Sequence, residues 1–292
     1  MKKILITGAG SFIGTSVTAY LGKWPEAYQI ETLDMLGDGW KEKDFSGFDT
    51  VFHVAGIAHS DSGKIPPEKE ALYYGVNRDL TVQTAKKAKE AGVKQFIFMS
   101  SAIVYGDSAP IGKDKYITKD TPPAPANCYG DSKLQAERGL QALESEDFRI
   151  VILRPPMIYG PGSRGNYPIL SRLAGMLPLF PQVENRRSML YIGNLAEFVR
   201  LMIENNERGI FWPQNAEYSN TSRLVAMIAE AKGKKIRLVK GFTWALKLMS
   251  RVTSLVNKAF GSLCYDMALS EYPQNYRIFT LEESIEETEK PA

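Results

Sequence analysis

The sequence predicts a doubly wound α/β fold, in which helices cover both faces of a parallel sheet. Short apolar runs alternate with helical patterns, and the runs are apolar on both faces, as strands of a buried parallel sheet are. The first run passes straight into a glycine-rich turn that opens a helix. The runs expected to be strands are 3–8, 30–34, 49–56, 95–101 and 149–155.

Helical patterns fill the intervals between these strands. The first extends from about Phe12 to Lys23, and the second covers 70–92. A third begins within NCYGDSKLQAE, where Asn127 is the expected N-cap. The interval 35–48 is too short and polar for a full helix and strand, so we expect a degenerate connection there.

The alternation fades after residue 155, where a stretch rich in Pro and Gly leads into shorter elements. We therefore expect two domains. The first covers 1–160, and a later segment of about 186–212 returns to it. The second covers 161–292 and is smaller and mainly helical.

Composition excludes several classes of protein. The chain of 292 residues is 44% hydrophobic and 24% charged, as is typical of a soluble globular protein. A net charge of +3 gives no long-range field that favours nucleic acid. The two cysteines lie far apart, which indicates a reducing, cytoplasmic compartment. No apolar run reaches the ~18 residues of a membrane span, so we expect no integral membrane segment.

Two later segments need separate interpretation. The basic run 232–240 predicts the end of a helix, a turn and a short strand rather than a nucleic-acid patch. The segment 242–260 has apolar residues at helical spacing, interrupted by three basic residues. A packed helix is favoured there, and a helix on a membrane surface is the alternative.

The glycine-rich turn TGAGSFIG has the context of a dinucleotide-binding motif. Glycines let the backbone approach a pyrophosphate, which then rests on the helix N-terminus. Asp34 ends the next strand, 20 residues after Gly14. Its carboxylate would bind both adenosine ribose hydroxyls and repel a 2′-phosphate, which predicts NAD rather than NADP. The alternative is a tight turn without a ligand. The cofactor contacts predicted in the turn are Gly8, Gly10, Ser11, Phe12, Ile13 and Gly14.

Tyr129 and Lys133 lie four residues apart in the helix that follows Asn127. Residues at this spacing share a helix face. A nearby ammonium group favours the ionised phenol, as a general base requires. The alternative is an ordinary solvated start of a helix.

In their order and spacing these motifs resemble the extended short-chain dehydrogenases/reductases, specifically the NAD-dependent nucleotide-sugar epimerase/dehydratase group with its UDP-glucose 4-epimerase-like enzymes. The resemblance covers nearly the whole chain. It implies a Rossmann-type NAD-binding domain and a smaller substrate domain. The motifs that carry it are TGAGSFIG (7–14), DTVFHVAG (49–56), VN (76–77), SSAIVYGD (100–107), YGDSK (129–133), RPPMIYGPG (154–162) and RRSMLYIGNLAEFV (186–199).

The resemblance implies roles for the residues that match these motifs. Ser101 would hold the substrate oxygen while hydride moves, and Tyr129 would be the acid and base. Lys133 would bind the nicotinamide ribose and lower the pKa of Tyr129, and Asn77 would support the network on the cofactor side. Further cofactor contacts implied are Val54, Ala55, Gly56 and Pro155. For Ser101 the alternative is a cap at a strand end, and for Asn77 a polar group of a helix.

Substrate contacts are expected from Ser101, His59, Tyr105, Met157 and Arg187. Arg187 matches a diphosphate-binding arginine of the family, and the guanidinium fork suits a pyrophosphate. His59 follows the carboxyl end of the third strand, where substrate lies in this architecture. His53 alternates with apolar residues and is expected to be a satisfied core histidine. We expect no metal site.

Three positions depart from the family pattern. Ser11 stands where the middle glycine is usual, and Met157 stands where many relatives have an asparagine. Ala102 follows Ser101, where dehydratases of the group carry an acid for the elimination of water. The sequence therefore disfavours dehydration.

The predicted function is NAD-dependent epimerisation of a nucleotide sugar at C4 through a 4-keto intermediate. A UDP-hexose or UDP-N-acetylhexosamine is the expected substrate. The alternatives are an NAD(P)H-dependent 4-keto-sugar reductase and a non-catalytic NAD-sensing or scaffold protein. Relatives also imply a homodimer formed by the helices at about 70–92 and 129–146. Its apolar stripe, which could instead face the sheet, is Leu72, Tyr73, Val76 and Leu80.

Overall fold

The computed structural model describes residues 1–57, 65–250 and 254–290. These residues form two compact units, and each unit draws on separate parts of the chain. Unit 1 comprises Met1–Gly106, Pro122–Pro155 and Leu195–Pro213. Unit 2 comprises Asp107–Thr121, Pro156–Asn194 and Gln214–Ala292. The division into domains near residue 160 stays a prediction.

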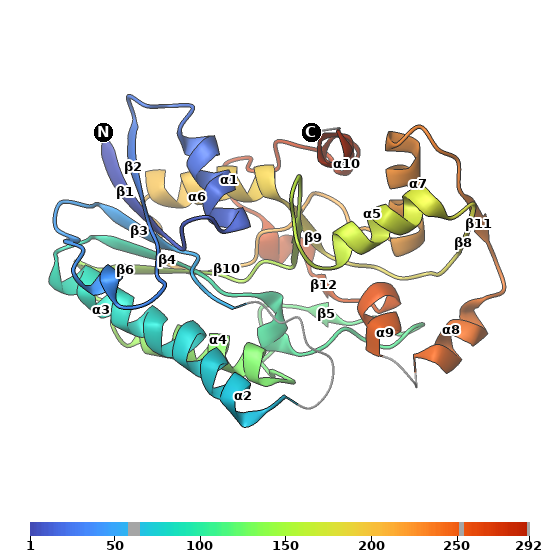
Figure 1. The fold of residues 1–292 in the computed structure, drawn as a ribbon, viewed down its shortest axis with the longest axis horizontal. Helices are drawn as coiled ribbons and strands as arrows, with labels where there is room; N and C mark the ends of the chain where they lie inside the picture. The colour runs from blue at the N-terminus through green and yellow to red at the C-terminus, as the bar shows by residue number, and fades with distance from the viewer. Residues whose placement is uncertain (58–64, 251–253, 291–292) are drawn as a thin grey trace. The chain divides into compact units, whose positions relative to one another are not determined.

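Unit 1 is built on a six-stranded sheet in the order β10-β6-β4-β3-β1-β2 (Figure 1). Neighbouring strands are parallel at each pair. This confirms the doubly wound α/β class. The strands are β1 (Lys2–Thr7), β2 (Tyr28–Leu33), β3 (Thr50–His53), β4 (Gln95–Met99), β6 (Arg149–Leu153) and β10 (Gly209–Phe211).

Helices cover both faces of this sheet (Figure 1). One face carries α1 (Phe12–Leu21) and the part of α6 (Ile192–Glu204) that belongs to unit 1. The other face carries α2 (Pro67–Tyr74), η2 (Gly75–Leu80), α3 (Thr81–Glu90) and α4 (Cys128–Gln141). Two short 3-10 turns, η1 (Gly39–Lys41) and η3 (Ala102–Tyr105), complete the unit.

The helical prediction for 70–92 is confirmed, but the segment is not a uniform α-helix. A π-helical stretch, η2, joins α2 to α3. Such stretches are rare and often occur at functional sites. The degenerate connection expected between β2 and β3 is also confirmed, because η1 is the one helical turn in the described chain there.

The core of unit 1 explains why its inner strands β3, β4 and β6 are apolar on both faces, whereas the edge strand β2 is largely exposed. Leu5, Phe96 and Phe98 pack with Ala88 and Leu140 beneath α3 and α4. Neighbouring strand residues point to the opposite face and are also buried. Burial of one such side chain contributes about 1.5–3 kcal/mol, so the paired faces account for much of the stability of the unit.

Unit 2 consists of helices and short two-stranded parallel sheets. β8 (Leu179–Pro181) pairs with β11 (Arg237–Val239), β5 (Tyr116–Ile117) with β12 (Cys264–Tyr265), and β7 (Met157–Tyr159) with β9 (Met189–Tyr191). The helices are α5 (Asn166–Met176), α7 (Thr221–Ala231), α8 (Thr243–Met249), α9 (Ser254–Phe260), η4 (Met267–Ser270) and α10 (Leu281–Glu289). Helices make up more of unit 2 than strands do, and the predicted second domain at 161–292 stays a prediction.

The predictions for the segments 232–240 and 242–260 differ in how well they agree with the structure. The basic run 232–240 follows the end of α7 and forms a turn and β11, as predicted. The segment 242–260 forms α8 and α9, and residues 251–253 lie outside the described residues. The prediction of a packed helix is wrong for α8, which exposes Trp244 and Leu248. Among the described residues, no helix has both the length and the hydropathy needed to cross a bilayer.

Candidate active site

The carboxyl ends of β1 and β3 mark the point where the strand order of the sheet reverses. Thr7, the last residue of β1, is in register with the last residues of both β2 and β3. Gly8, Asp34 and Val54 therefore leave the sheet at one edge. Ligands of open α/β sheets bind at such a switch point.

The turn after β1 has positive φ angles at Gly8 and Gly10, and at Gly8 it also comes too close to its neighbours for a side chain. Gly8 has φ +86°, and a Cβ there would lie 2.8 Å from the backbone nitrogen of Ala55. Gly10 has φ +76°, and a Cβ there would meet no atom within 4 Å. Ser11 is the N-cap of α1, and its Oγ accepts the N–H of Gly14 at 3.1 Å. The space beside this helix N-terminus fits the pyrophosphate of a dinucleotide.

The cap explains the departure at Ser11. A helix N-terminus needs an acceptor for one of its first N–H groups, and a serine hydroxyl provides one. In this turn the Ser11 side chain serves as the cap through its bond to Gly14. The positive φ, which favours glycine, occurs at Gly10 instead. Asp34 lies exposed after β2, with Oδ1 accepting the N–H of Leu36 at 3.0 Å. An exposed carboxylate here fits an adenosine ribose.

The residues predicted to be catalytic come from two neighbouring elements of unit 1. Ser101 is the N-cap of η3 after β4, and Tyr129 and Lys133 lie in the first turns of α4. Asn127 caps α4, as predicted, and accepts the N–H of Gly130 at 2.9 Å. The Ser101 side chain lies near the Tyr129 phenol and affects its ionisation. Burial raises the pKa of Tyr129, and the nearby Ser101 side chain opposes this rise.

Lys133 is fixed at the carboxyl end of β4. Its side chain is buried, and Nζ donates to the carbonyl oxygen of Met99 at 2.9 Å. A Cβ at Gly56 would lie 3.1 Å from this nitrogen, so a larger residue there would crowd the ammonium group. Burial lowers the pKa of Lys133 to about 8, and the nearby Glu137 carboxylate opposes the shift.

Asn77 ties the segment after β3 to α4. It lies in η2 and is fully buried. Its Oδ1 accepts the N–H of Ile57 at 2.9 Å, and its Nδ2 donates to the Ile57 carbonyl and to Ser132 Oγ, both at 3.2 Å. Gly56 and the start of α4 are thereby held at fixed positions.

A buried polar network behind these residues escaped the sequence patterns. Glu137 accepts hydrogen bonds from Ser100 Oγ and from Arg154, whose Nη2 lies 2.5 Å from Oε2. Arg154 also donates from Nη1 to the Tyr105 oxygen at 2.6 Å. The same oxygen accepts Trp212 Nε1–H at 2.7 Å. The sequence signal that could have pointed to Glu137 is its place four residues after Lys133, which puts both side chains on the same face of α4.

Other predicted residues lie in varied surroundings. Tyr105 is only 3% exposed and belongs to the buried network. The Pro155 carbonyl accepts the N–H of Ala102 at 2.8 Å. Met157 begins β7 of unit 2 and is half-buried. His59 lies outside the described residues.

Arg187 lies in unit 2 and is held by unit 2. Its Nη1 donates to the carbonyl oxygen of Ala259 at 3.0 Å, and burial lowers its pKa to about 10. Its backbone pairs with Ser219. Its binding of a diphosphate stays a prediction.

His53 is confirmed as a satisfied core histidine. Nδ1 lies 2.7 Å from Thr7 Oγ1, and Nε2 lies 3.1 Å from Thr81 Oγ1. The ring is fully buried, which lowers the pKa to about 3. His53 is therefore neutral at physiological pH.

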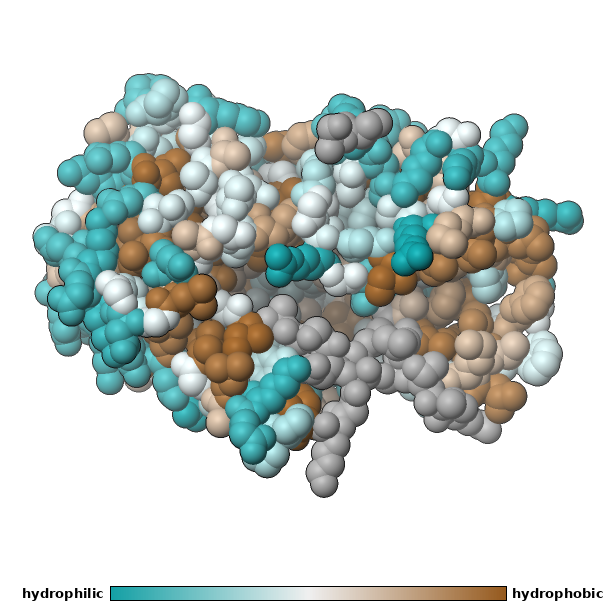
Figure 2. Space-filling view, viewed as in Figure 1, coloured by the Kyte–Doolittle hydropathy of each residue, from teal (hydrophilic) through white to brown (hydrophobic). Residues whose placement is uncertain are grey.

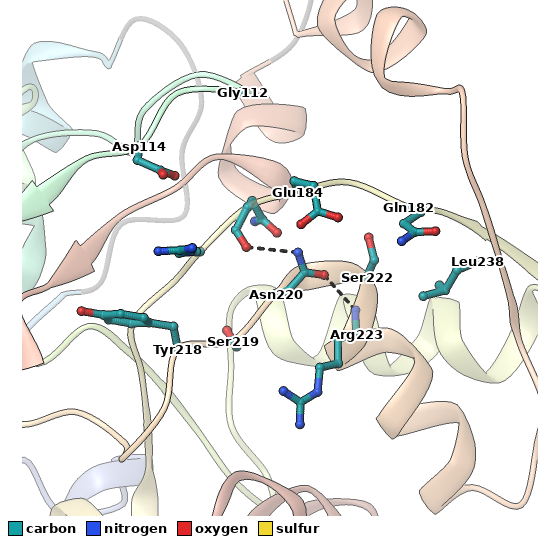
Figure 3. A pocket seen from close by; sticks show the side chains of 12 residues that line it. Gly112, Asp114, Gln182, Glu184, Tyr218, Ser219, Asn220, Ser222, Arg223 and Leu238 are labelled. Carbon is teal, nitrogen blue, oxygen red and sulfur yellow. Dashed lines mark hydrogen bonds between the residues drawn. The ribbon is translucent and has the colours of Figure 1, made fainter.

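Unit 2 also contains a pocket of about 700 Å³ (Figure 3). Asn220, the N-cap of α7, accepts the N–H of Arg223 at 3.0 Å and donates to the Asn185 carbonyl at 3.1 Å. The lining contains both carboxylates and guanidinium groups. None of the predicted site residues lines this pocket, so it has no part in the candidate active site. The lining residues are Gly112, Asp114, Gln182, Glu184, Asn185, Arg186, Tyr218, Ser219, Asn220, Ser222, Arg223 and Leu238.

Comparison with known proteins agrees with this geometry. Residues 4–211 match the model of the NAD dependent epimerase/dehydratase family. A UDP-glucose 4-epimerase of Vibrio cholerae is 30% identical, over 98% of this chain and 94% of the relative. The N-acetyl-alpha-D-glucosaminyl-diphospho-ditrans,octacis-undecaprenol 4-epimerase of Escherichia coli O157:H7 is 32% identical, over 80% of this chain and 73% of the relative.

Solved structures share the fold at lower identity. A UDP-glucuronic acid 4-epimerase from Bacillus cereus, in complex with NAD, has a TM-score of 0.74 at 20% identity and covers 98% of this chain and 96% of its own. A dTDP-4-dehydrorhamnose reductase from Bacillus anthracis, in complex with NADP, has a TM-score of 0.73 at 19% identity and covers 99% and 98%. The chain thus belongs to the NAD dependent epimerase/dehydratase family, and its cofactor is NAD.

Proposed function

We propose that this protein interconverts the C4 epimers of a UDP-linked hexose or N-acetylhexosamine. The observation that carries the proposal is the placement of Ser101 at the start of η3 beside Tyr129 in the first turn of α4, with Lys133 one helical turn further along α4 and its ammonium group fixed by the Met99 carbonyl. The two curated relatives described above are both 4-epimerases, which supports C4 as the reacting carbon.

Each side chain has a separate task in the proposed reaction. Tyr129 takes the proton of the 4-hydroxyl group, and Ser101 donates a hydrogen bond to the oxygen that becomes a ketone. When bound, NAD would supply the acceptor for the C4 hydride and the donor for its return. Once the 4-keto sugar has turned over, Tyr129 gives its proton back to the oxygen. Proton and hydride are both returned, so the reaction changes only the configuration at C4.

Lys133 makes the phenolate possible. Burial alone raises the pKa of Tyr129, which would keep the phenol protonated at neutral pH. A cation nearby favours the phenolate form. The carbonyl of Met99 and the position of Gly56 fix this cation, so little reorganisation is needed during the reaction.

The proposal excludes dehydration. Elimination of water beside a 4-keto group needs an acid for the leaving hydroxyl, and relatives that dehydrate place one after the catalytic serine or threonine. Ala102 stands at that position, buried, with its N–H bonded to the Pro155 carbonyl. A methyl group can neither give nor take the proton.

A homodimer and a cytoplasmic location remain part of the proposal. Only part of the predicted apolar stripe is available for a partner. Leu72 is 52% exposed, whereas Tyr73 is buried beside Tyr129 and Leu80 packs on the cluster that contains Met35. Sedimentation at micromolar concentration tests the assembly, and a monomeric mass would contradict it.

The activity is tested by incubating the purified protein and NAD with a panel of UDP-hexoses and UDP-N-acetylhexosamines. We expect a mixture of two C4 epimers and no net change in NADH. Stoichiometric consumption of NADH with a 4-keto sugar nucleotide, without epimerisation, would show a reductase instead. A product that lacks one water would show a dehydratase.

A further inference from the structure

Basic side chains are distributed unevenly along this chain. From Ala231 to Tyr265 the sequence contains eight Lys or Arg residues and no Asp or Glu. The other residues contain 28 basic and 33 acidic side chains, so they are net negative although the whole chain is +3. The eight are Lys232, Lys234, Lys235, Arg237, Lys240, Lys247, Arg251 and Lys258. A cationic segment of this kind is attracted to anionic surfaces.

The same segment exposes large apolar side chains. The exposed fractions are 51% for Phe242, 71% for Trp244, 56% for Leu248 and 53% for Met249. Trp244 and Leu248 lie one turn apart on the same face of α8. Leu246 is 8% exposed and holds the helix to unit 2. Aromatic and aliphatic side chains that flank lysines are typical of helices in the interface of a bilayer.

A second group of exposed apolar side chains lies beside β11, the strand that leads to α8. Leu179 of β8 is 53% exposed and is in register with Arg237 of β11. Met176 and Leu177 precede it and are 66% and 39% exposed. Lys234 donates to a backbone carbonyl in the last turn of α5 at 2.5 Å. Figure 2 shows hydrophobic side chains at the surface of this end of unit 2.

We propose that this surface binds the headgroup region of an anionic lipid bilayer. We call it the α8 patch and define it by the apolar Phe242, Trp244, Leu248, Met249, Met176, Leu177 and Leu179 and the exposed cations Lys234, Lys235, Arg237, Lys240 and Lys247. The apolar side chains enter the boundary between headgroups and acyl chains, and the cations bind lipid phosphates. At seven residues, α8 is about 10 Å long and lies in the plane of the surface.

Charge distinguishes a bilayer from a second copy of the chain as the occupant. In a two-fold interface the same patch meets itself, so the cations of one copy would face those of the other. The sequence from Ala231 to Tyr265 provides no carboxylate to offset this repulsion. An anionic lipid surface offers the opposite charge together with an apolar layer beneath it.

Vesicle flotation with the full-length protein tests the proposal independently of its activity. Vesicles of phosphatidylcholine alone are compared with vesicles that also contain phosphatidylglycerol. We expect binding to the anionic vesicles and its loss at high salt, because added ions screen the lysines. Trp244→Ser with Leu248→Ser should weaken partitioning about tenfold. Lys234→Gln with Lys240→Gln should weaken it about tenfold at low salt.

Two variants control for loss of any exposed apolar or basic side chain. Ile278→Ser changes a residue of unit 2 that is 42% exposed and lies outside the patch, and Lys86→Gln changes an exposed lysine of α3. Both should bind vesicles like the unaltered protein. Thermal unfolding of each variant verifies the fold.

Three results would overturn the proposal. One is failure to bind either kind of vesicle, and another is equal binding to neutral and anionic vesicles. The third is binding that the Trp244→Ser and Leu248→Ser changes leave unaltered. Self-association that these changes abolish, without vesicle binding, would assign the α8 patch to an interface between copies.

Discussion

Two lysines show how differently this chain places positive charge. Lys133 of unit 1 is buried, bonded to the Met99 carbonyl, and has a pKa lowered to about 8. Lys247 of unit 2 is exposed on α8 among apolar side chains. Groups of the protein itself hold the Lys133 ammonium in place. Lys247 belongs to the α8 patch, for which we propose a separate binding partner, the bilayer.

The difference follows from what each charge is surrounded by. Near Lys133 the fold supplies a carbonyl, a glycine and the carboxylate of Glu137, so the geometry is complete without a partner. Around Lys247 along the chain, from Ala231 to Tyr265, the sequence contains further cations and apolar residues but no carboxylate. Changes at the first kind of site should therefore have larger effects than changes at exposed surface positions.

The largest effect is expected from Tyr129→Phe. The change removes only the ionisable oxygen that lies near Ser101. Turnover should fall by about 10³-fold, in the range of a lost general base. Calorimetry with NAD should show near-normal affinity, which separates loss of chemistry from loss of binding. Turnover within a few-fold of the unaltered protein would remove Tyr129 from the mechanism.

The next effect is on stability and concerns the buried pair of Arg154 and Glu137. Glu137→Gln leaves the Arg154 guanidinium buried without its counter-charge. The free energy of unfolding should fall by about 3 kcal/mol or more. Asp38→Asn, which removes an exposed ion pair with Lys41, should change it little. Urea denaturation measures both unfolding free energies. Equal decreases for the two variants would contradict the importance of the buried pair of Arg154 and Glu137.

A third prediction concerns pH. Because the pKa of Lys133 is lowered to about 8 in the folded protein, unfolding at higher pH is accompanied by proton uptake by this lysine. Its contribution makes the unfolding free energy rise with pH from about 8 towards the pKa of an ordinary lysine, by up to about 1.4 kcal/mol per pH unit. Lys133→Met should lose this rise. Lys247→Met should keep the profile of the unaltered protein, and identical profiles for both variants would refute the assignment.

The smallest effect is expected for cofactor choice. NAD should bind about tenfold or more tightly than NADP, because the Asp34 carboxylate repels a 2′-phosphate. Asp34→Ser should narrow this ratio, mainly through better binding of NADP. Calorimetry with both cofactors measures it, and tighter binding of NADP to the unaltered protein would overturn the role of Asp34.

Local patterns were sufficient to predict much of unit 1. The inner strands of the sheet are apolar on both faces, and Asn127 and the glycine-rich turn mark the starts of the helices that follow them. These features depend on neighbours within a few residues along the chain. Periodicity therefore reports them reliably.

Other features depend on partners that are distant in sequence. The bond from Arg154 to Glu137 joins positions 17 residues apart, and that from Trp212 to Tyr105 joins positions 107 apart. No repeat or cap signals them. Likewise, β8 and β11 have three residues each, too few to show a period. The exposed face of α8 looked like a packed helix because spacing does not reveal whether another element covers an apolar face.

The central claim is that the protein epimerises a UDP-sugar at C4 by removing a hydride and returning it to the opposite face. A UDP-sugar that carries deuterium at C4 tests this claim most directly. If the hydride leaves C4 and returns to the opposite face within one enzyme molecule, the epimer formed should keep its deuterium at C4. Mass spectrometry and NMR of the separated products measure this. Product without deuterium, or deuterium released into free NADH, would contradict epimerisation at C4 by the pair of Tyr129 and Lys133.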